Sequence, residues 1–343
     1  MNPQEYLENR IKDCTKYKLS EADEKFIKDN SLREFLFKQM TRKKFRRYKL
    51  TDLTKEKINE ALDYCMSDNK PIIFRLWFGG YKLWRYPTTP EVEWAEFFVL
   101  AHYCEFLAPL IATYKPGIKL LFTSDDVFVE RLNNIPKSDT DAYYNSFQKL
   151  LDEFRKYFPK NFEADMIRHS ALYDSEKEFE VDFTEQVTIA KKTWKSSRTL
   201  EQIASKFQIS KMNIKWDGVE DLTKLSEEDK QKKIEQSIIY HDALVQMPKI
   251  RAWGFTPDKI AISNNPFPGG IAIGATKNSI VRFWVGTGVL ETKDDTYADR
   301  IFSIQQYEDS KDISCQEIKV DFIPLKNFSS VKLYNQKFEF ANK

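Results

Sequence analysis

The sequence lacks the short motifs that identify the commonest nucleotide-binding and hydrolytic enzymes. No GxGxxG segment follows an apolar run, no GxxxxGK[ST] phosphate loop is present, and no serine or cysteine stands in a GxSxG-type elbow. Histidine occurs three times and glycine ten times in 343 residues. The four cysteines, at positions 14, 65, 104 and 315, are too far apart for a CxxC metal site and do not suggest a disulfide framework.

Charge of one sign and a membrane-spanning run are also missing. With 54 basic and 52 acidic residues the net charge is +2, so no overall field indicates nucleic acid. The first residues contain no apolar segment of a signal peptide. The longest apolar region, residues 97–114, is interrupted by His102, Glu105 and Pro109, which is typical of a buried helix and not of a membrane span. We expect a soluble, reduced, cytoplasmic protein that does not associate with membranes.

The chain contains enough apolar residues for a large core, and its patterns divide it into three segments. Hydrophobic residues make up 41% and aromatic residues 14% of the chain. Residues 1–67 carry apolar residues at helical spacing and are predicted to form a helical extension. Residues 68–174 alternate strand and helix patterns, as in a Rossmann-like core with parallel strands. Residues 175–343 are predicted to be three helices followed by a strand-rich, mixed α+β region packed on the core, with strands at 259–263, 271–275, 280–285 and one or two after 315.

The centre of this α/β prediction is a βαβ unit. PIIFRLW (71–77) reads as a strand, residues 90–114 as a long helix, and IKLLFTS (118–124) as a second strand; FEADMIRHSAL (162–172) reads as a third. Parallel strands joined by a helix end on the same edge of the sheet, where open α/β sheets bind ligands. The FGGYKLWR loop and the Ser-Asp-Asp loop should therefore lie side by side and form a site for a polar, anionic small molecule.

The loop after the first strand carries Lys82 and Arg85 beside a pair of glycines. Glycine lets the backbone approach a ligand, while lysine offers a point charge and arginine a planar fork, so the loop is a candidate for phosphate or carboxylate capture. The alternative is an ordinary exposed loop in which Trp84 and Tyr86 pack inward.

Acidic and imidazole side chains follow the next two strands. Asp125 and Asp126 come directly after the second strand. Such a pair can bind a metal with a nucleotide, cap the following helix, or position a substrate amine or hydroxyl. His169 stands at the end of the third strand and would share this edge, so with Arg168 it is the best acid–base candidate among the histidines.

Two further segments have open interpretations. Residues 42–49 contain six basic residues interleaved with Phe45 and Tyr48, which fits RNA binding, a solvated helix end, or steering of phosphate toward a nearby pocket. In the glycine-rich segment 264–279, Lys277 could contact phosphate, or the segment could be a plain hairpin.

Several of these motifs, in this order, resemble the pyoverdine/dityrosine biosynthesis family, the isocyanide synthases. The resemblance rests on the Lys82 loop, PEVEWAE (90–96), YKPG (114–117), SDDVF (124–128) and DAYYNSF (141–147). The chain departs from the family pattern at Asp126, where the family has glycine, and at 260–266, where the family's R-L-S-I-H-P loses its arginine and histidine. The resemblance implies a Rossmann-like core with added helices.

It also implies an activity in secondary metabolism. Family members join the amine of an amino acid, often tyrosine or tryptophan, to a carbon from ribulose 5-phosphate and form an isonitrile. They need no metal or redox cofactor, and a separate iron- and 2-oxoglutarate-dependent oxygenase commonly acts next. We expect the phosphate at Lys82 and Arg85, the ammonium at Asp125 or Asp126, and proton transfer by His169 and Tyr81. An aromatic substrate would meet Trp77, Trp84 and Phe128.

One geometric expectation follows: Lys82 should lie within reach of Asp125 and His169 in one pocket. Two other functions remain open. Asp125 and Asp126 could hold a divalent metal in a sugar- or nucleotidyltransferase. Residues 42–49 could bind RNA in a protein without catalytic activity.

Overall fold

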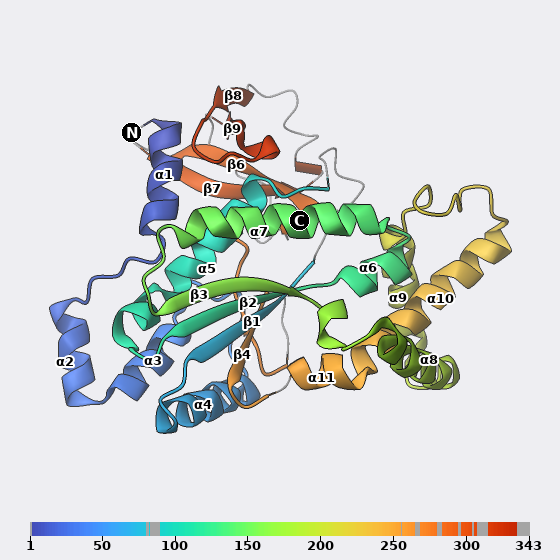
Figure 1. Ribbon diagram of the computed structural model, residues 1–343, viewed down its shortest axis with the longest axis horizontal. Helices are drawn as coiled ribbons and strands as arrows, with labels where there is room; N and C mark the ends of the chain where they lie inside the picture. The colour runs from blue at the N-terminus through green and yellow to red at the C-terminus, as the bar shows by residue number, and fades with distance from the viewer. Residues whose placement is uncertain are drawn as a thin grey trace.

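The computed structural model describes residues 2–79, 82, 90–254, 256–264, 268–279, 283–293, 296–303, 305–306 and 315–334. Its centre is a parallel sheet in the order β3-β2-β1-β4-β5 with helices on its faces (Figure 1), which confirms the predicted α/β class. The strands are β1 (Ile72–Phe78), β2 (Ile118–Ser124), β3 (Phe162–Arg168), β4 (Lys259–Ser263) and β5 (Ile271–Ala272). The sheet therefore draws its last two strands from well beyond residues 68–174.

The register of the sheet brings the ends of three strands level. Phe78 pairs with Ser124, and Ser124 pairs with Arg168. Because β1, β2 and β3 run in parallel, the residues that follow them all emerge at one edge. Most residues of β1 are buried, as expected for a strand covered by helices on both faces.

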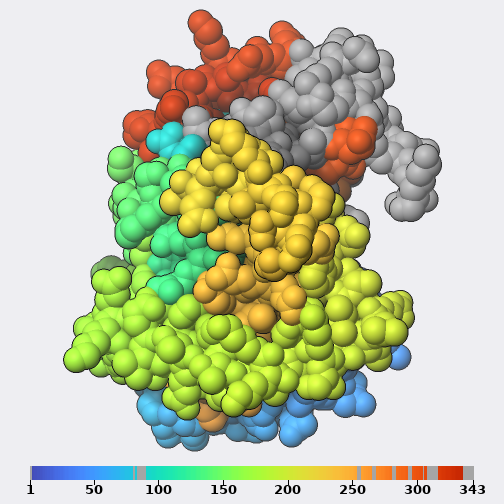
Figure 2. Space-filling view, turned by 90° about the vertical axis from the view of Figure 1, so that its right-hand side faces the viewer, coloured from blue at the N-terminus to red at the C-terminus, as the bar shows by residue number. Residues whose placement is uncertain are grey.

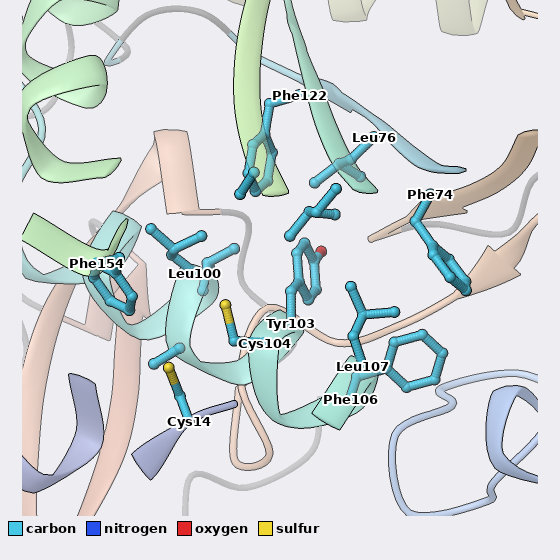
Figure 3. Close-up of a cluster of buried hydrophobic side chains, with 14 of the residues drawn as sticks. Cys14, Phe74, Leu76, Leu100, Tyr103, Cys104, Phe106, Leu107, Phe122 and Phe154 are labelled. Carbon is cyan, nitrogen blue, oxygen red and sulfur yellow. The ribbon is translucent and has the colours of Figure 1, made fainter. Parts of the chain in front are cut away.

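Helix α5 (Trp94–Thr113) supplies much of the core. It begins with a capping box formed by Glu93 and Glu96. In Figure 3 its Leu100, Phe106 and neighbouring side chains meet apolar residues of β1 and β2. Within the described part of the chain, α5 is the one helix long and apolar enough to cross a membrane, and 89% of its most apolar window is buried inside the protein.

The N-terminal extension is helical, as predicted. Each of its helices begins with a side-chain oxygen that accepts a hydrogen bond from the first turn, and the capping residues are Asn2, Ser20, Ser31 and Thr51. The helices are α1 (Pro3–Asp13), α2 (Glu21–Asp29), α3 (Leu32–Met40) and α4 (Asp52–Ser67).

A group of helices covers the carboxyl ends of the strands. They are α6 (Asp126–Asn133), α8 (Glu176–Thr193), α9 (Leu200–Asn213), α10 (Glu227–Gln246) and α11 (Pro248–Gly254), whereas α7 (Lys137–Arg155) packs along β3. These covering helices share a second apolar core that includes Phe183, Ile238 and Leu244. Figure 2 looks onto this side of the molecule, where the yellow-green to orange segments cover the surface.

The C-terminal region forms a mixed sheet in the order β7-β6-β9-β8. Its strands are β6 (Gly286–Lys293), β7 (Thr296–Ser303), β8 (Cys315–Lys319) and β9 (Ser330–Tyr334). The strands predicted at 259–263 and after 315 are confirmed, but the one predicted at 280–285 is wrong in its described part: Phe283–Val285 is a 3-10 turn, η2. Residues 280–282 lie outside the described residues. The sheet packs on α5, where Trp94 Nε1 donates to the Ser330 carbonyl at 2.6 Å.

Candidate active site

A cavity of about 560 Å³ lies at the carboxyl ends of the parallel strands. The loop residues that follow β1, β2 and β3 form one wall, and the covering helices with η2 form the rest. This volume is typical of a site for a small molecule. The residues that line it are Trp77, Gly79, Asp125, Phe128, Val129, Leu132, Asn133, His169, Lys206, Ile209, Ser210, Asn213, Ser237, Ile238, His241, Val245, Ile250, Arg251, Trp284 and Val285.

Asp125 and His169 meet on the sheet side of this cavity. His169 Nδ1 lies 3.4 Å from Asp125 Oδ1; the imidazole is 2% exposed, whereas 30% of the Asp125 side chain is exposed. Burial lowers the pKa of His169 to about 3, so its ring is neutral at physiological pH. Burial, and then the charge of Asp126, raise the pKa of Asp125 well above its ordinary value. Both ring nitrogens of His169 are buried and have no hydrogen-bond partner among the described residues, so His169 and Asp125 form an unsatisfied polar pair in the cavity wall.

Asp126 serves a different purpose from its neighbour. Its Oδ1 accepts the backbone N–H of His169 at 3.1 Å, and its Oδ2 accepts the Ser170 hydroxyl at 2.5 Å. It is buried and does not line the cavity. We therefore assign Asp126 to positioning the loop that carries His169, in place of the predicted contact with substrate. Because Asp125 and Asp126 face different surroundings, a shared metal between them is not favoured.

Lys82 does not lie where the sequence predicts, in one pocket with Asp125 and His169. Its side chain is 2% exposed and its Nζ lies 2.9 Å from a carboxylate oxygen of both Glu93 and Glu96. The same Nζ donates to the carbonyls of Phe283 at 2.8 Å and Gly286 at 3.1 Å. Lys82 does not line the cavity, so the predicted pocket shared with Asp125 and His169 is wrong. The physical reason is that a buried ammonium requires carboxylate partners, and PEVEWAE supplies two of them one helical turn apart.

This buried cluster shapes the cavity wall indirectly. The two carbonyls that Lys82 binds belong to the residues on either side of Trp284 and Val285, which line the cavity. Burial alone would lower the pKa of Lys82, but the carboxylates of Glu93 and Glu96 outweigh it and raise that pKa. Burial raises the pKa of Glu96 to about 7 in spite of the nearby lysine.

The remaining predicted residues are dispersed. Phe128 lies in the cavity wall, with its ring 5.3 Å from that of His169. Arg168 turns toward α7: its Nη2 lies 2.6 Å from Asp141 Oδ1, and it does not line the cavity. Lys277 is exposed and also absent from the lining. Tyr81, Trp84 and Arg85 lie outside the described residues.

The arginines of the basic stretch 42–49 are used within the protein. Arg42 donates to the carbonyls of Gln39 and Phe106. Arg46 and Arg47 likewise donate to backbone carbonyls, the latter to residues 276, 277 and 279. Arg42 and Arg47 thus tie this stretch to α5 and to residues 276–279, whereas Lys43, Lys44 and Lys49 are exposed.

Sequence reasoning missed the helical side of the cavity. Lys206, His241 and Arg251 line it from α9, α10 and α11, and Trp284 lines it from η2. Nothing in the local pattern identifies them, since each stands in an amphipathic helix or an apolar run far along the chain from the strand ends. Only the packing of the covering helices over the sheet brings them to the site.

Comparisons with known proteins give a likeness among solved structures. No protein-family model and no curated protein sequence matches the chain. Among solved structures, the crystal structure of the PvcA protein from Pseudomonas aeruginosa matches with a TM-score of 0.61 at 14% sequence identity. The match covers 89% of this chain and 100% of PvcA. At this level of identity the likeness shows a shared fold.

Proposed function

We propose that this chain is an enzyme of the isocyanide synthase type, which joins the amine of an aromatic amino acid, tyrosine or tryptophan, to a carbon from a pentulose phosphate. The observation that carries the proposal is the Asp125–His169 pair, placed in a small-molecule cavity at the carboxyl ends of the parallel strands. The order of motifs from Lys82 to Phe128 and the PvcA-like fold support the same assignment.

The cavity suits the first part of this reaction. Trp77, Phe128 and Trp284 offer faces on which an aromatic side chain can pack. The raised pKa of Asp125 makes its ionised form a stronger base than an ordinary carboxylate, so it can take a proton from the substrate ammonium. The neutral amine then attacks the sugar carbonyl carbon and forms a carbinolamine.

The same two residues can complete the condensation. Asp125, now protonated, returns its proton to the carbinolamine hydroxyl, which leaves as water; the product is the protonated imine, and Asp125 is ionised again. His169, neutral and 3.4 Å away, can relay this proton between the carboxyl group and the substrate. General acid–base residues of this kind contribute about 10²–10⁴-fold to rate.

The test is a product screen by mass spectrometry. Purified protein is incubated with ribulose 5-phosphate and each of the twenty amino acids, and the expected product is an isonitrile from tyrosine or tryptophan. Asp125→Asn should lower its rate of formation by about 10²-fold or more, whereas Lys211→Met, which changes an exposed residue outside the cavity, should leave it unchanged. Absence of any isonitrile with folded protein would contradict the proposed reaction.

The proposal extends to the cellular setting. An isonitrile formed in the cytoplasm would pass to an iron- and 2-oxoglutarate-dependent oxygenase as its next enzyme. A gene for such an oxygenase beside the gene for this chain would support that step. Conversion of the purified product by the neighbouring oxygenase is the direct assay, and an unchanged product would contradict it.

A further inference from the structure

We propose that Lys206 of α9 and Arg251 of α11 form an oxyanion subsite within the cavity and bind the phosphate of the sugar substrate. The identity of that substrate rests on the proposed function, whereas the subsite rests on the cavity itself. The sequence predicts that Lys82 binds the anion, but its ammonium is enclosed by two carboxylates and two carbonyls. We therefore assign the anion to Lys206 and Arg251.

The charge of the cavity wall is the first argument. Among the described lining residues, the full positive charges are those of Lys206 and Arg251, and the carboxyl group is that of Asp125. Asp125 stands on the sheet side, beside His169. On the helical side Lys206 shares the Asp242 carboxylate with Arg198, and Arg251 adds a further positive charge, so this side keeps a net positive charge that complements an anionic ligand.

Lys206 is held in place by one carboxylate and keeps further N–H donors for a ligand. Its Nζ lies 2.8 Å from Asp242 Oδ1, and Arg198 binds the other carboxylate oxygen of Asp242 at 2.8 Å. Burial raises the pKa of Asp242, but hydrogen bonds from His241 and Lys206 outweigh it and bring that pKa to about 2, so the anchor stays charged. An ammonium carries three N–H donors, and this contact uses one of them.

Arg251 offers a second set of donors from another helix. Its Nη1 donates to Gln246 Oε1 at 3.2 Å, and a guanidinium carries five N–H groups in a planar fork. Ser210 and Asn213 of α9 and Ser237 of α10 lie on the same wall and add neutral hydrogen-bonding groups. A bound molecule would thus have its anionic end among the helices and its reacting end beside Asp125.

The experiment measures binding without turnover, by the fluorescence of the tryptophans, two of which line the cavity. Ribulose 5-phosphate, ribulose, inorganic phosphate, tyrosine and tyramine are titrated into the full-length chain. The variants are Lys206→Met and Arg251→Met, with Lys206→Arg retaining the charge. Lys211→Met is the matched control, since it makes the same change at an exposed position of α9 outside the cavity. Thermal melting of each variant confirms that it is folded.

The proposal predicts that Lys206→Met and Arg251→Met each weaken binding of ribulose 5-phosphate roughly tenfold or more, the scale of a lost charged hydrogen bond. Ribulose should bind all variants alike, and Lys206→Arg should retain most of the affinity. If the two methionine variants bind tyrosine more weakly but bind tyramine as the parent does, the subsite binds an anion, and that anion is the carboxylate of the amino acid. The subsite would be overturned if Lys206→Met and Arg251→Met bound ribulose 5-phosphate and tyrosine as tightly as the parent does. It would also be overturned if Lys211→Met weakened binding of these ligands to the same extent. A folded protein that makes no isonitrile but binds phosphate through Lys206 would refute the proposed reaction alone.

Discussion

Replacing Lys82 with methionine is the sharpest test of the buried cluster. The side-chain stem remains, but the charge between Glu93 and Glu96 is lost, and both carboxylates are less than a tenth exposed. Removing one partner of a buried ion pair costs about 3–5 kcal/mol, because the remaining charge is left without compensation. Free energies of unfolding are typically about 5–15 kcal/mol, so the loss should be plain in urea denaturation.

The effect should also depend on pH. Burial raises the pKa of Glu96 to about 7, above its value in the unfolded chain. Between those two values the folded protein holds a proton that the unfolded chain has released, so the free energy of unfolding falls as the pH rises. Lys82 lowers that pKa, and its removal should raise it further. The variant should therefore lose more stability at pH 8 than at pH 6.

The matched control is Lys119→Met in β2, whose partner Glu163 is mostly exposed. Exposed ion pairs contribute about 0–1 kcal/mol, so this variant should unfold almost as the parent protein does. The reasoning about Lys82 would be refuted by a loss no larger than that of the control, or by a loss that does not vary between pH 6 and pH 8.

Three further results are expected. Asp125→Asn should lower kcat by about 10²-fold or more while leaving the melting temperature nearly unchanged, and an equal rate would remove Asp125 from the mechanism. Gly79→Ala should weaken binding of tyrosine, since an added Cβ would come within 2.9 Å of the Trp284 ring in the cavity wall; unchanged affinity in a fluorescence titration would contradict this. Gly117→Ala should lower the free energy of unfolding by about 1–3 kcal/mol, since φ is +108° and the Cβ would lie 2.9 Å from the Asn161 carbonyl; an unchanged urea midpoint would count against it.

Three of the five strands of the parallel sheet, β1, β2 and β3, could be predicted as one core because their information is local. β1 and β2 are short, largely apolar runs, β3 alternates apolar and polar residues, and α5 is a long helix whose start is marked by Glu93 and Glu96. The rule that parallel strands end on one edge was then enough to place Asp125 and His169 together.

The rest depends on contacts between distant segments. Residues 280–285 read as a strand, but Phe283–Val285 forms the 3-10 turn η2, and Lys82 binds the carbonyls of Phe283 and Gly286 around it. Lys82 itself follows two glycines and reads as exposed, and only its partners reveal that it is buried. Lys206 and Arg251 reach the cavity because α9 and α11 fold over the sheet, which no local pattern encodes.

One cavity, at the carboxyl ends of the strands, should bind both substrates. A crystal structure of the Asp125→Asn variant, soaked with tyrosine and ribulose 5-phosphate, tests it most directly. We predict the amine within hydrogen-bonding distance of residue 125, the aromatic ring against Trp77 or Trp284, and the phosphate beside Lys206. Ligands bound outside this cavity, or a phosphate seated at the Lys82 loop, would contradict the account.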